Sequence, residues 1–427
     1  MRLLRWTATA LLLLLVVLAT APFVIVFLGI EQKARVVPVA GATAGDVARL
    51  RDLLRYQDPR YLSHGARSSA ALTERDINLG LGASPYSDRL TARVAITPGL
   101  AMLHSSVRLP ANPRGNYFNA SLMVSESRGQ LALEELQVGP VTLPGMLLAP
   151  AAALLDHLLR ARLPEYDRVR RALRAVWLQE RAVQLDYQWD EVLARQLEAR
   201  GRDAVMPAHE REAFAAYYRE AVENSRRARR GASLDALLQP LFALASRRSV
   251  GGDTAKENRA LLLVVGTVVR GASAQLLLGE EQAQRLGRVR AVGWTLQGRA
   301  DLAQHFGISA ALAVAGGSAL ADAIGVFKEL DDSRGGTGFS FVDLLADRAG
   351  VALAERATGA RADAVQRLLG GPGLREEDYM PDIALLPEGL LELTFLRRYG
   401  DLDDPRYAAA QAEIERRIAA LPVHATR

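Results

Sequence analysis

The spacing of the hydrophobic residues changes near residue 190, and this change constrains the fold more than any other feature. Before it, apolar and polar residues alternate over several short segments, as in strands with one buried face. The clearest alternation covers residues 183–189. After residue 190 the apolar residues recur at helical spacing and no convincing strand is found. We therefore predict an α+β fold, in which an antiparallel sheet domain with helices precedes an all-α domain.

The alternating segments predict an antiparallel meander of three or four strands, because Gly and Pro turns separate them. Thr73 is followed three residues later by Asp76, which is close to a capping box and predicts a helix over residues 72–81. The strand at residues 183–189 is expected to rejoin the meander. The other expected elements are strands around residues 94–96, 118–124 and 131–138 and helices over residues 146–163 and 165–180.

A long apolar run precedes these domains. No charged residue lies between Arg5 and Glu31, and a helix over residues 6–30 is long enough to cross a hydrocarbon core of about 30 Å. Arg2 and Arg5 favour a cytoplasmic N-terminus, with the bulk of the chain on the periplasmic or extracytoplasmic side. A cleaved signal peptide is the alternative, since residues 19–21 have a small-x-small pattern. We favour an uncleaved, single-pass helix in the cytoplasmic membrane, with residues 6–30 as the membrane contact.

The composition excludes several functions. The 427 residues include no cysteine, which excludes disulfides, thiolate catalysis and Cys-ligated zinc. A net charge of +5 is weak for this length, and no nucleic-acid motif is present, so no nucleic-acid partner is expected. The sequence also lacks the Gly-x-Ser-x-Gly, phosphate-loop and His-Glu-x-x-His motifs of common enzyme classes.

The domain organisation follows from these patterns. We expect a cytoplasmic stub and membrane helix at residues 1–31, a linker with a short helix at 32–71, the α+β domain at 72–190, a helical connector at 191–255 and a helical domain at 256–427.

A cluster of polar residues lies in an otherwise small and apolar stretch of the helical domain. Asp343 and Asp347 are four residues apart, hence on one helix face, and Glu329 and Asp332 are three apart, hence on another. If one straight helix covered residues 302–330, His305 would lie about 36 Å from Glu329. A hairpin broken at Gly316-Gly317 would bring both ends together. The candidate polar site is His305, Lys328, Glu329, Asp332, Asp343 and Asp347.

Three interpretations of this cluster compete. His305, Glu329, Asp343 and Asp347 could hold a metal ion that generates a hydroxide for hydrolysis. Alternatively, Arg and Lys side chains, namely Lys328, Arg348 and Arg299, could pair with the carboxylates while His305 bonds a backbone carbonyl, because buried charges need partners. A surface for a partner protein or a lipid head group is the third interpretation. The sequence assigns neither a metal nor a cofactor.

Two segments resemble known families. "DLAQHFGISAALA", "DAIGVFKELDD" and "GTGFSFVDLLADRAG", within residues 301–350, resemble the YfiM-like bacterial envelope lipoproteins, a family without an established activity. Residues 72–190, with "LTERDIN" and "VGPVTLPGMLL", resemble the anchored extracytoplasmic domains of the YpmS type. The second resemblance implies a curved sheet wrapped around a helix, an arrangement that could hold a lipid or a polypeptide in an apolar groove.

These expectations together indicate a membrane-anchored envelope protein. Its expected role is non-catalytic binding or scaffolding at the outer face of the cytoplasmic membrane, with a lipid, an envelope polymer or a partner protein. The alternative function is a metal-dependent hydrolase of an envelope lipid or glycan that uses His305, Glu329, Asp343 and Asp347.

Overall fold

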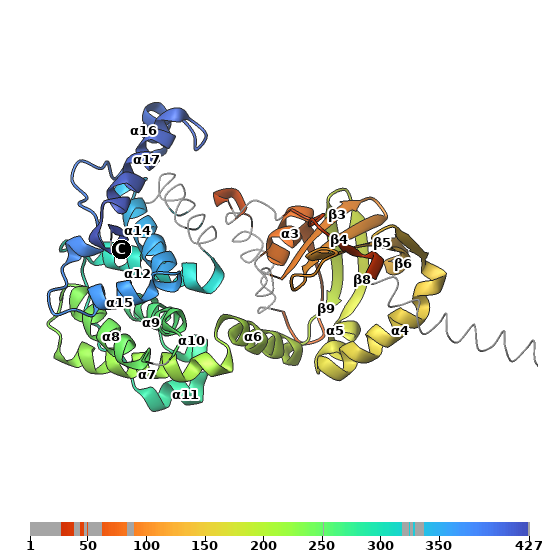
Figure 1. Ribbon diagram of the computed structural model, residues 1–427, viewed down its shortest axis with the longest axis horizontal. Coiled ribbons are helices and arrows are strands. Elements are labelled where there is room, and N and C mark those ends of the chain that lie inside the picture. Colours follow the sequence, from red (N-terminus) through yellow and green to blue (C-terminus); the bar gives the residue numbers. More distant parts are fainter. Residues whose placement is uncertain are drawn as a thin grey trace, which may run out of the picture. The chain divides into compact units, whose positions relative to one another are not determined.

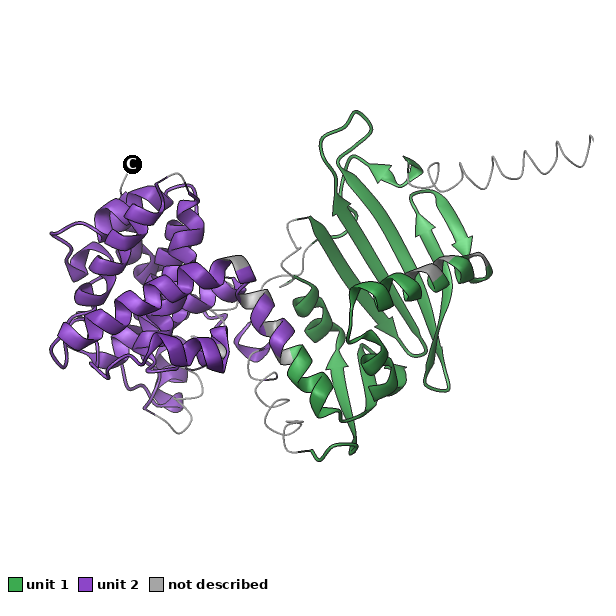
Figure 2. Cartoon of the chain, turned by 90° about the horizontal axis from the view of Figure 1, so that it is seen from below, with its two compact units in different colours: residues 1–40, 53–197 green, residues 41–52, 198–427 purple. Residues whose placement is uncertain are grey.

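The structure is a computed structural model that describes residues 27–37, 43–46, 49, 62–82, 89–250, 252–317, 324, 328 and 337–425. The chain divides into two compact units, which are described separately (Figures 1 and 2). Unit 1 comprises residues 1–40 and 53–197, and unit 2 comprises residues 41–52 and 198–427.

The larger sheet of unit 1 is an antiparallel meander, as the alternating sequence predicts. Five strands follow one another, rather than three or four, and the additional short strand β1 pairs with the start of β5. The Gly99 and Gly129 turns join two of the hairpins. The strands are β1 (Ile30–Glu31), β3 (Leu90–Thr97), β4 (Leu100–Arg108), β5 (Tyr117–Ser127), β6 (Gln130–Val138) and β7 (Val141–Pro144).

A second sheet contains three antiparallel strands in the order β2 (Arg67–Thr73), β9 (Ala182–Gln188) and β8 (Leu173–Gln179). The strand expected at residues 183–189 is therefore real, but it does not rejoin the meander. The helix expected over residues 165–180 is wrong in its second half, since only α5 (Tyr166–Ala172) is helical. The physical reason is the alternate burial of Val176 and Leu178, which pack against Ile96 of the larger sheet.

Two helices accompany the sheets of unit 1. α3 (Glu74–Gly82) begins with a reciprocal cap, in which Thr73 N donates to Asp76 Oδ2 (2.8 Å) and Asp76 N donates to Thr73 Oγ1 (3.1 Å). The capping box is thus confirmed with Asp in the place of Glu. α4 (Gly145–Arg162) crosses one face of the larger sheet (Figure 2), against which it packs at β6 and β7.

Within the described residues of unit 2, the regular elements are helices, joined by loops that contain isolated β-bridges. α9 is almost wholly buried and packs against α7, α12 and α14, as expected for a core helix. The helices are α6 (Glu191–Val205), which begins in unit 1, α7 (Ala208–Arg227), α8 (Asp235–Arg248), α9 (Thr254–Val269), α10 (Gln275–Leu278), α11 (Glu280–Leu286), α12 (Ala300–Gly316), α14 (Phe341–Thr358), α15 (Ala362–Leu369), the 3-10 helix η2 (Glu376–Asp378), α16 (Glu392–Tyr399), α17 (Pro405–Ala419) and α18 (Pro422–Ala425).

The predicted membrane helix requires a correction. No helix within the described ranges is long and apolar enough to cross a membrane, so the transmembrane part of the predicted fold class and the single-pass assignment are wrong. Residues 6–26 of the expected span lie outside the described residues. At its other end the expected helix is replaced by β1, because Ile30 pairs with Phe118 and Glu31 with Tyr117 in the larger sheet.

The expected linker and connector also differ from the structure. Residues 67–71 belong to β2, a strand of the second sheet, instead of a linker. α7 and α8, which lie within the expected connector at 191–255, contribute Phe214, Tyr217 and Phe242 to the main hydrophobic core. Unit 2 therefore begins well before residue 256.

Candidate functional site

The candidate site lies where α12 and α14 pack closely side by side. Small residues allow this approach: a Cβ atom at Gly350 of α14 would collide with the carbonyl oxygen of Phe306 on α12. A Cβ atom at Gly307 of α12 would likewise crowd Val269 of α9. Because the backbones are this close, short side chains on the two helices can reach one another.

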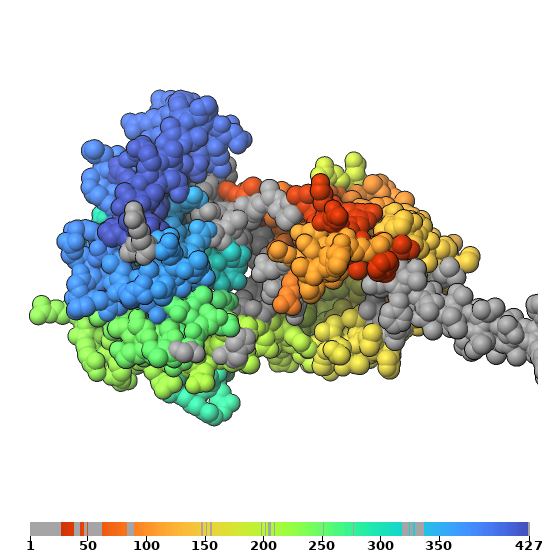
Figure 3. Space-filling model, in the orientation of Figure 1, coloured from red at the N-terminus to blue at the C-terminus, as the bar shows by residue number. Residues whose placement is uncertain are grey.

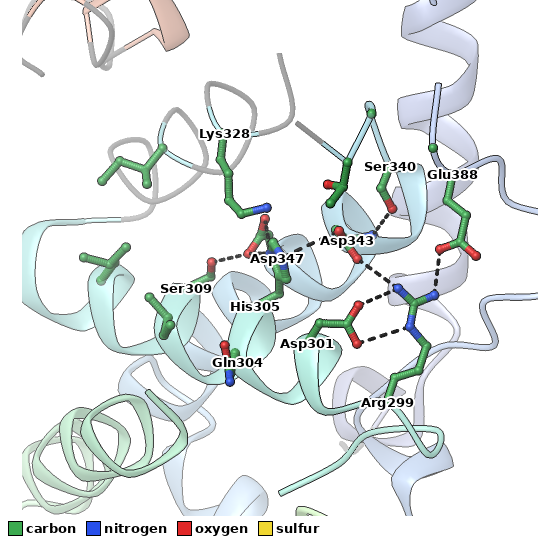
Figure 4. A pocket seen from close by; sticks show the side chains of 16 residues that line it. Arg299, Asp301, Gln304, His305, Ser309, Lys328, Ser340, Asp343, Asp347 and Glu388 are labelled. Carbon is green, nitrogen blue, oxygen red and sulfur yellow. Dashed lines mark hydrogen bonds and ion pairs between the residues drawn. The ribbon is translucent and has the colours of Figure 1, made fainter. Parts of the chain in front are cut away.

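A pocket of about 600 Å³ opens along these helices (Figure 4). α12 presents one face to it, on which Asp301, His305 and Ser309 follow each other at intervals of four residues. We call it the His305 pocket. Its lining residues are Arg299, Asp301, Gln304, His305, Ile308, Ser309, Leu312, Ile324, Lys328, Thr337, Gly338, Ser340, Asp343, Asp347, Glu388 and Gly389.

His305 and Asp347 form the polar centre of the pocket. Nδ1 of His305 lies 3.1 Å from Oδ1 and 3.2 Å from Oδ2 of Asp347. The Oγ of Ser309 donates a hydrogen bond of 2.6 Å to Asp347 Oδ1. The side chains of His305 and Asp347 are only 11% and 6% exposed. This buried carboxylate therefore orients both polar side chains of α12.

Asp343 lies on the other side of the imidazole ring. Its Oδ2 is 3.6 Å from His305 Nε2, and its Oδ1 is 3.6 Å from Arg299 Nη2. Ser340 caps α14 by accepting a 3.0 Å hydrogen bond from the backbone N of Asp343. Oδ1 of Asp343 is buried and accepts no hydrogen bond from the part of the chain that the structure describes. A buried acceptor of this kind favours a ligand that supplies a donor.

The pKa values of His305 and Asp343 are both raised by their surroundings. Burial opposes the imidazolium, but the hydrogen bond with Asp347 and the negative charges of Asp347 and Asp343 outweigh it and raise the pKa of His305. Burial raises the pKa of Asp343 by more than the positive charges of His305 and Lys328 lower it. The site thus retains protons to higher pH than isolated side chains would.

Arg299 closes one end of the pocket and holds two other acidic residues. Its Nη2 lies 2.6 Å from Asp301 Oδ2, and its Nη1 lies 2.7 Å from Glu388 Oε2. A backbone bridge places Glu388 here, since Phe339 and Leu390 exchange hydrogen bonds of 2.8 and 3.0 Å. The strongest bonds of this guanidinium are therefore made within the protein.

The structure brings four of the six predicted site residues to one pocket: His305, Lys328, Asp343 and Asp347. Figure 4 shows Lys328 extending toward His305 and Asp347 from the opposite wall. Glu329 and Asp332 lie outside the described residues. The predicted break is present, because α12 ends at Gly316 and Gly317 has a φ of +90°, a conformation that glycine adopts readily.

The described residues contain no ligand set that would support the metal-site interpretation. Among them, no group of three or more His, Asp or Glu side chains is arranged to hold a metal ion. The geometry explains this: the two ring nitrogens of His305 face different carboxylates, so the imidazole separates Asp343 from Asp347. Glu329, the remaining predicted ligand, lies outside the described ranges.

The structure contains only part of the network of ion pairs that the second interpretation predicts. Arg299 contacts Asp343, but Arg348 pairs with Glu415, away from the cluster. His305 bonds a carboxylate and not a backbone carbonyl.

The sequence analysis missed Ser309 and Glu388 as site residues. The position of Ser309 four residues after His305 was a usable signal, whereas Glu388 reaches Arg299 across 89 residues of sequence.

Comparisons with family models, curated proteins and solved structures give no match for this chain. The YfiM-like and YpmS-type resemblances stay predictions.

Proposed function

We propose that the chain is a non-catalytic binding protein and that the His305 pocket holds its ligand. The observation that carries this proposal is the buried Oδ1 of Asp343, which lines the pocket and accepts no hydrogen bond from the described residues. A ligand with a hydroxyl or ammonium group would supply the missing donor and offset the desolvation of the carboxyl group.

The rest of the pocket supports an amphiphilic ligand. Ile308 and Leu312 line it one and two turns along α12 from the polar centre, and Ile324 also lines it. A ligand with a donor head near Asp343 and a short apolar portion along these residues would contact both kinds of wall. The resemblance of residues 301–350 to YfiM-like proteins supports a role in the bacterial envelope.

The proposal predicts a preference among head groups. Asp301, Asp343, Asp347 and Glu388 give the pocket four acidic side chains, and Arg299 already contacts three of them. These four groups outnumber Arg299 and Lys328, the permanent cations that line the pocket, so a ligand carboxylate would be disfavoured and would leave Asp343 Oδ1 without a donor. Octylamine and octanol should therefore bind more tightly than octanoate, which has a similar tail.

Calorimetric titration of the full chain with these three compounds tests the proposal. Asp343→Asn should weaken octylamine binding by about tenfold, as expected for the loss of a charge-assisted hydrogen bond. Asp363→Asn on α15 is the matched control, since Asp363 is exposed and paired with Arg367 outside the pocket. Octanoate binding as tightly as octylamine, or an Asp343→Asn variant that behaves like the control, would contradict the proposal.

A metal-dependent hydrolase is the second candidate function. His305 between two carboxylates is the observation that favours it, because imidazole and carboxylate groups suit zinc, manganese and magnesium. It ranks second because these three groups do not converge on one point. Elemental analysis of the purified full chain beside His305→Ala distinguishes the two candidates, since only the hydrolase requires a stoichiometric metal that the variant loses.

A further inference from the structure

The outward face of α4 in unit 1 is apolar and exposed over most of its length. Met146 is 83% exposed, and the exposed residues that follow it at helical spacing as far as residue 157 carry no carboxylate, ammonium or guanidinium group. These residues, which we call the α4 stripe, are Met146, Ala149, Pro150, Ala153 and His157. The inward side of the helix packs against β6 and β7, where Leu148 is buried.

This arrangement reverses the usual amphipathic pattern. A surface helix of a soluble domain normally presents charged residues to solvent. The α4 stripe instead extends for about 16 Å, the length of eleven residues of helix, without a permanently charged side chain. Leu158 beside it is 46% exposed. Contiguous exposed apolar surface of this kind marks an interaction site.

Basic residues gather at the C-terminal end of the stripe. Residues 145–174 contain six arginines and three acidic residues, a net charge of +3. The side chains of Arg160 and Arg170 are 48% and 54% exposed, and both pair with Asp156 of α4, so the excess positive charge comes from the group as a whole. Figure 3 shows α4 and α5 (yellow) at the surface of unit 1. The stripe and the arginines therefore lie next to each other on accessible helices.

We propose that α4 docks unit 1 on an anionic lipid surface, with the helix axis in the plane of the interface. An apolar helix face beside arginines is the pattern of interfacial helices, whose apolar side enters the acyl boundary while the basic side chains contact head groups. The net charge of +3 beside the stripe complements the negative charge of anionic head groups and therefore favours an anionic bilayer as its partner. Such a helix lies on the membrane and does not span it.

The absence of cysteine permits a local test in the full chain, because a single introduced cysteine can be labelled without background. Ala153→Cys places an environment-sensitive fluorophore at the centre of the α4 stripe. Ala409→Cys, at an exposed alanine of α17, is the matched control. Each labelled protein is mixed with vesicles of phosphatidylcholine alone or with phosphatidylglycerol added. Circular dichroism verifies that both variants fold.

With anionic vesicles, the label at position 153 should increase in emission by about twofold or more and shift to the blue, as expected for entry into the acyl boundary. The label at position 409 should stay in water. Adding Arg160→Glu and Arg162→Glu should reduce the response, and so should high salt. An unchanged label at position 153, or an equal response to neutral vesicles, would overturn the proposal. A response that rises with protein concentration alone would also overturn it, in favour of self-association.

Discussion

Nδ1 of His305 lies 3.1 Å from Asp347 Oδ1, and this contact joins α12 to α14 across 42 residues of sequence. Both side chains are buried, and Ser309 shares the same carboxylate. The contact fixes the orientation of the imidazole ring and directs its other nitrogen toward Asp343. The arrangement of the whole pocket therefore depends on one buried acidic residue.

Asp347→Ala should destabilise the folded chain by about 3 kcal/mol, because it leaves His305 and Ser309 without their acceptor in a buried site. Urea unfolding followed by circular dichroism measures the change. Asp363→Ala should cost less than about 1 kcal/mol, since its ion pair with Arg367 is exposed. In a double-mutant cycle with His305→Ala, the coupling energy should be about 1–3 kcal/mol, and simple additivity would show that the contact is energetically neutral.

Stability should fall as pH rises above neutrality. Since the folded chain raises the pKa of His305, folding favours the protonated ring. This contribution is fully present below the unfolded pKa of about 6.5 and is lost as pH rises through the folded pKa. The pKa of Asp343 is also raised, so its contribution has the same sign and begins to decline above the unfolded pKa of about 3.9. The difference in melting temperature between the wild type and His305→Gln should therefore shrink as pH rises, and a growing difference would contradict this assignment.

Gly350→Ala should destabilise unit 2 by about 1–3 kcal/mol, because the added methyl group would meet the carbonyl of Phe306 and force α12 and α14 apart. It should also weaken ligand binding, since both helices line the His305 pocket. Gly373→Ala is the control, as a Cβ atom there meets nothing within 4 Å. Thermal unfolding and octylamine titration of the two variants give the comparison. Equal melting temperatures of the two variants would mean that α12 and α14 accommodate the added methyl group without loss of stability.

A chelator should change neither stability nor ligand binding if the pocket recognises its ligand through Asp343 alone. Melting temperature and octylamine affinity are measured before and after incubation with EDTA. A bound ion would stabilise the folded state by mass action, so its removal would lower the melting temperature. A fall in the melting temperature of the wild type after EDTA treatment, with no fall for His305→Ala, would favour the hydrolase function over the binding function.

Local spacing predicts part of this site, but contacts between distant segments do not follow from it. The four-residue intervals of His305 with Ser309 and of Asp343 with Asp347 place these residues on shared helix faces. Which carboxylate faces which ring nitrogen depends on how α12 and α14 pack, and no local pattern encodes that packing. The same limit applies to Glu388, whose backbone bridge between Phe339 and Leu390 joins segments far apart in the sequence.

The fold shows a similar division between local and tertiary information. Thr73 and Asp76 predict the start of α3 because the cap is formed by neighbouring residues. β8 is missed because Arg174 and Ala175 suit a helix, while burial of Val176 and Leu178 against Ile96 favours a strand. Tertiary packing overrides the local preference there.

The order of segments along the chain has a consequence for biosynthesis. Residues 41–52 belong to unit 2, although residues 53–197 of unit 1 follow them. During translation residues 1–40 of unit 1 precede this short piece, residues 53–197 of unit 1 follow it, and the rest of unit 2 comes last. A nascent chain that has reached residue 197 holds every segment of unit 1 but only a fragment of unit 2. Unit 1 can therefore fold first, whereas residues 41–52 can pack into unit 2 only after the C-terminal helices have been synthesised.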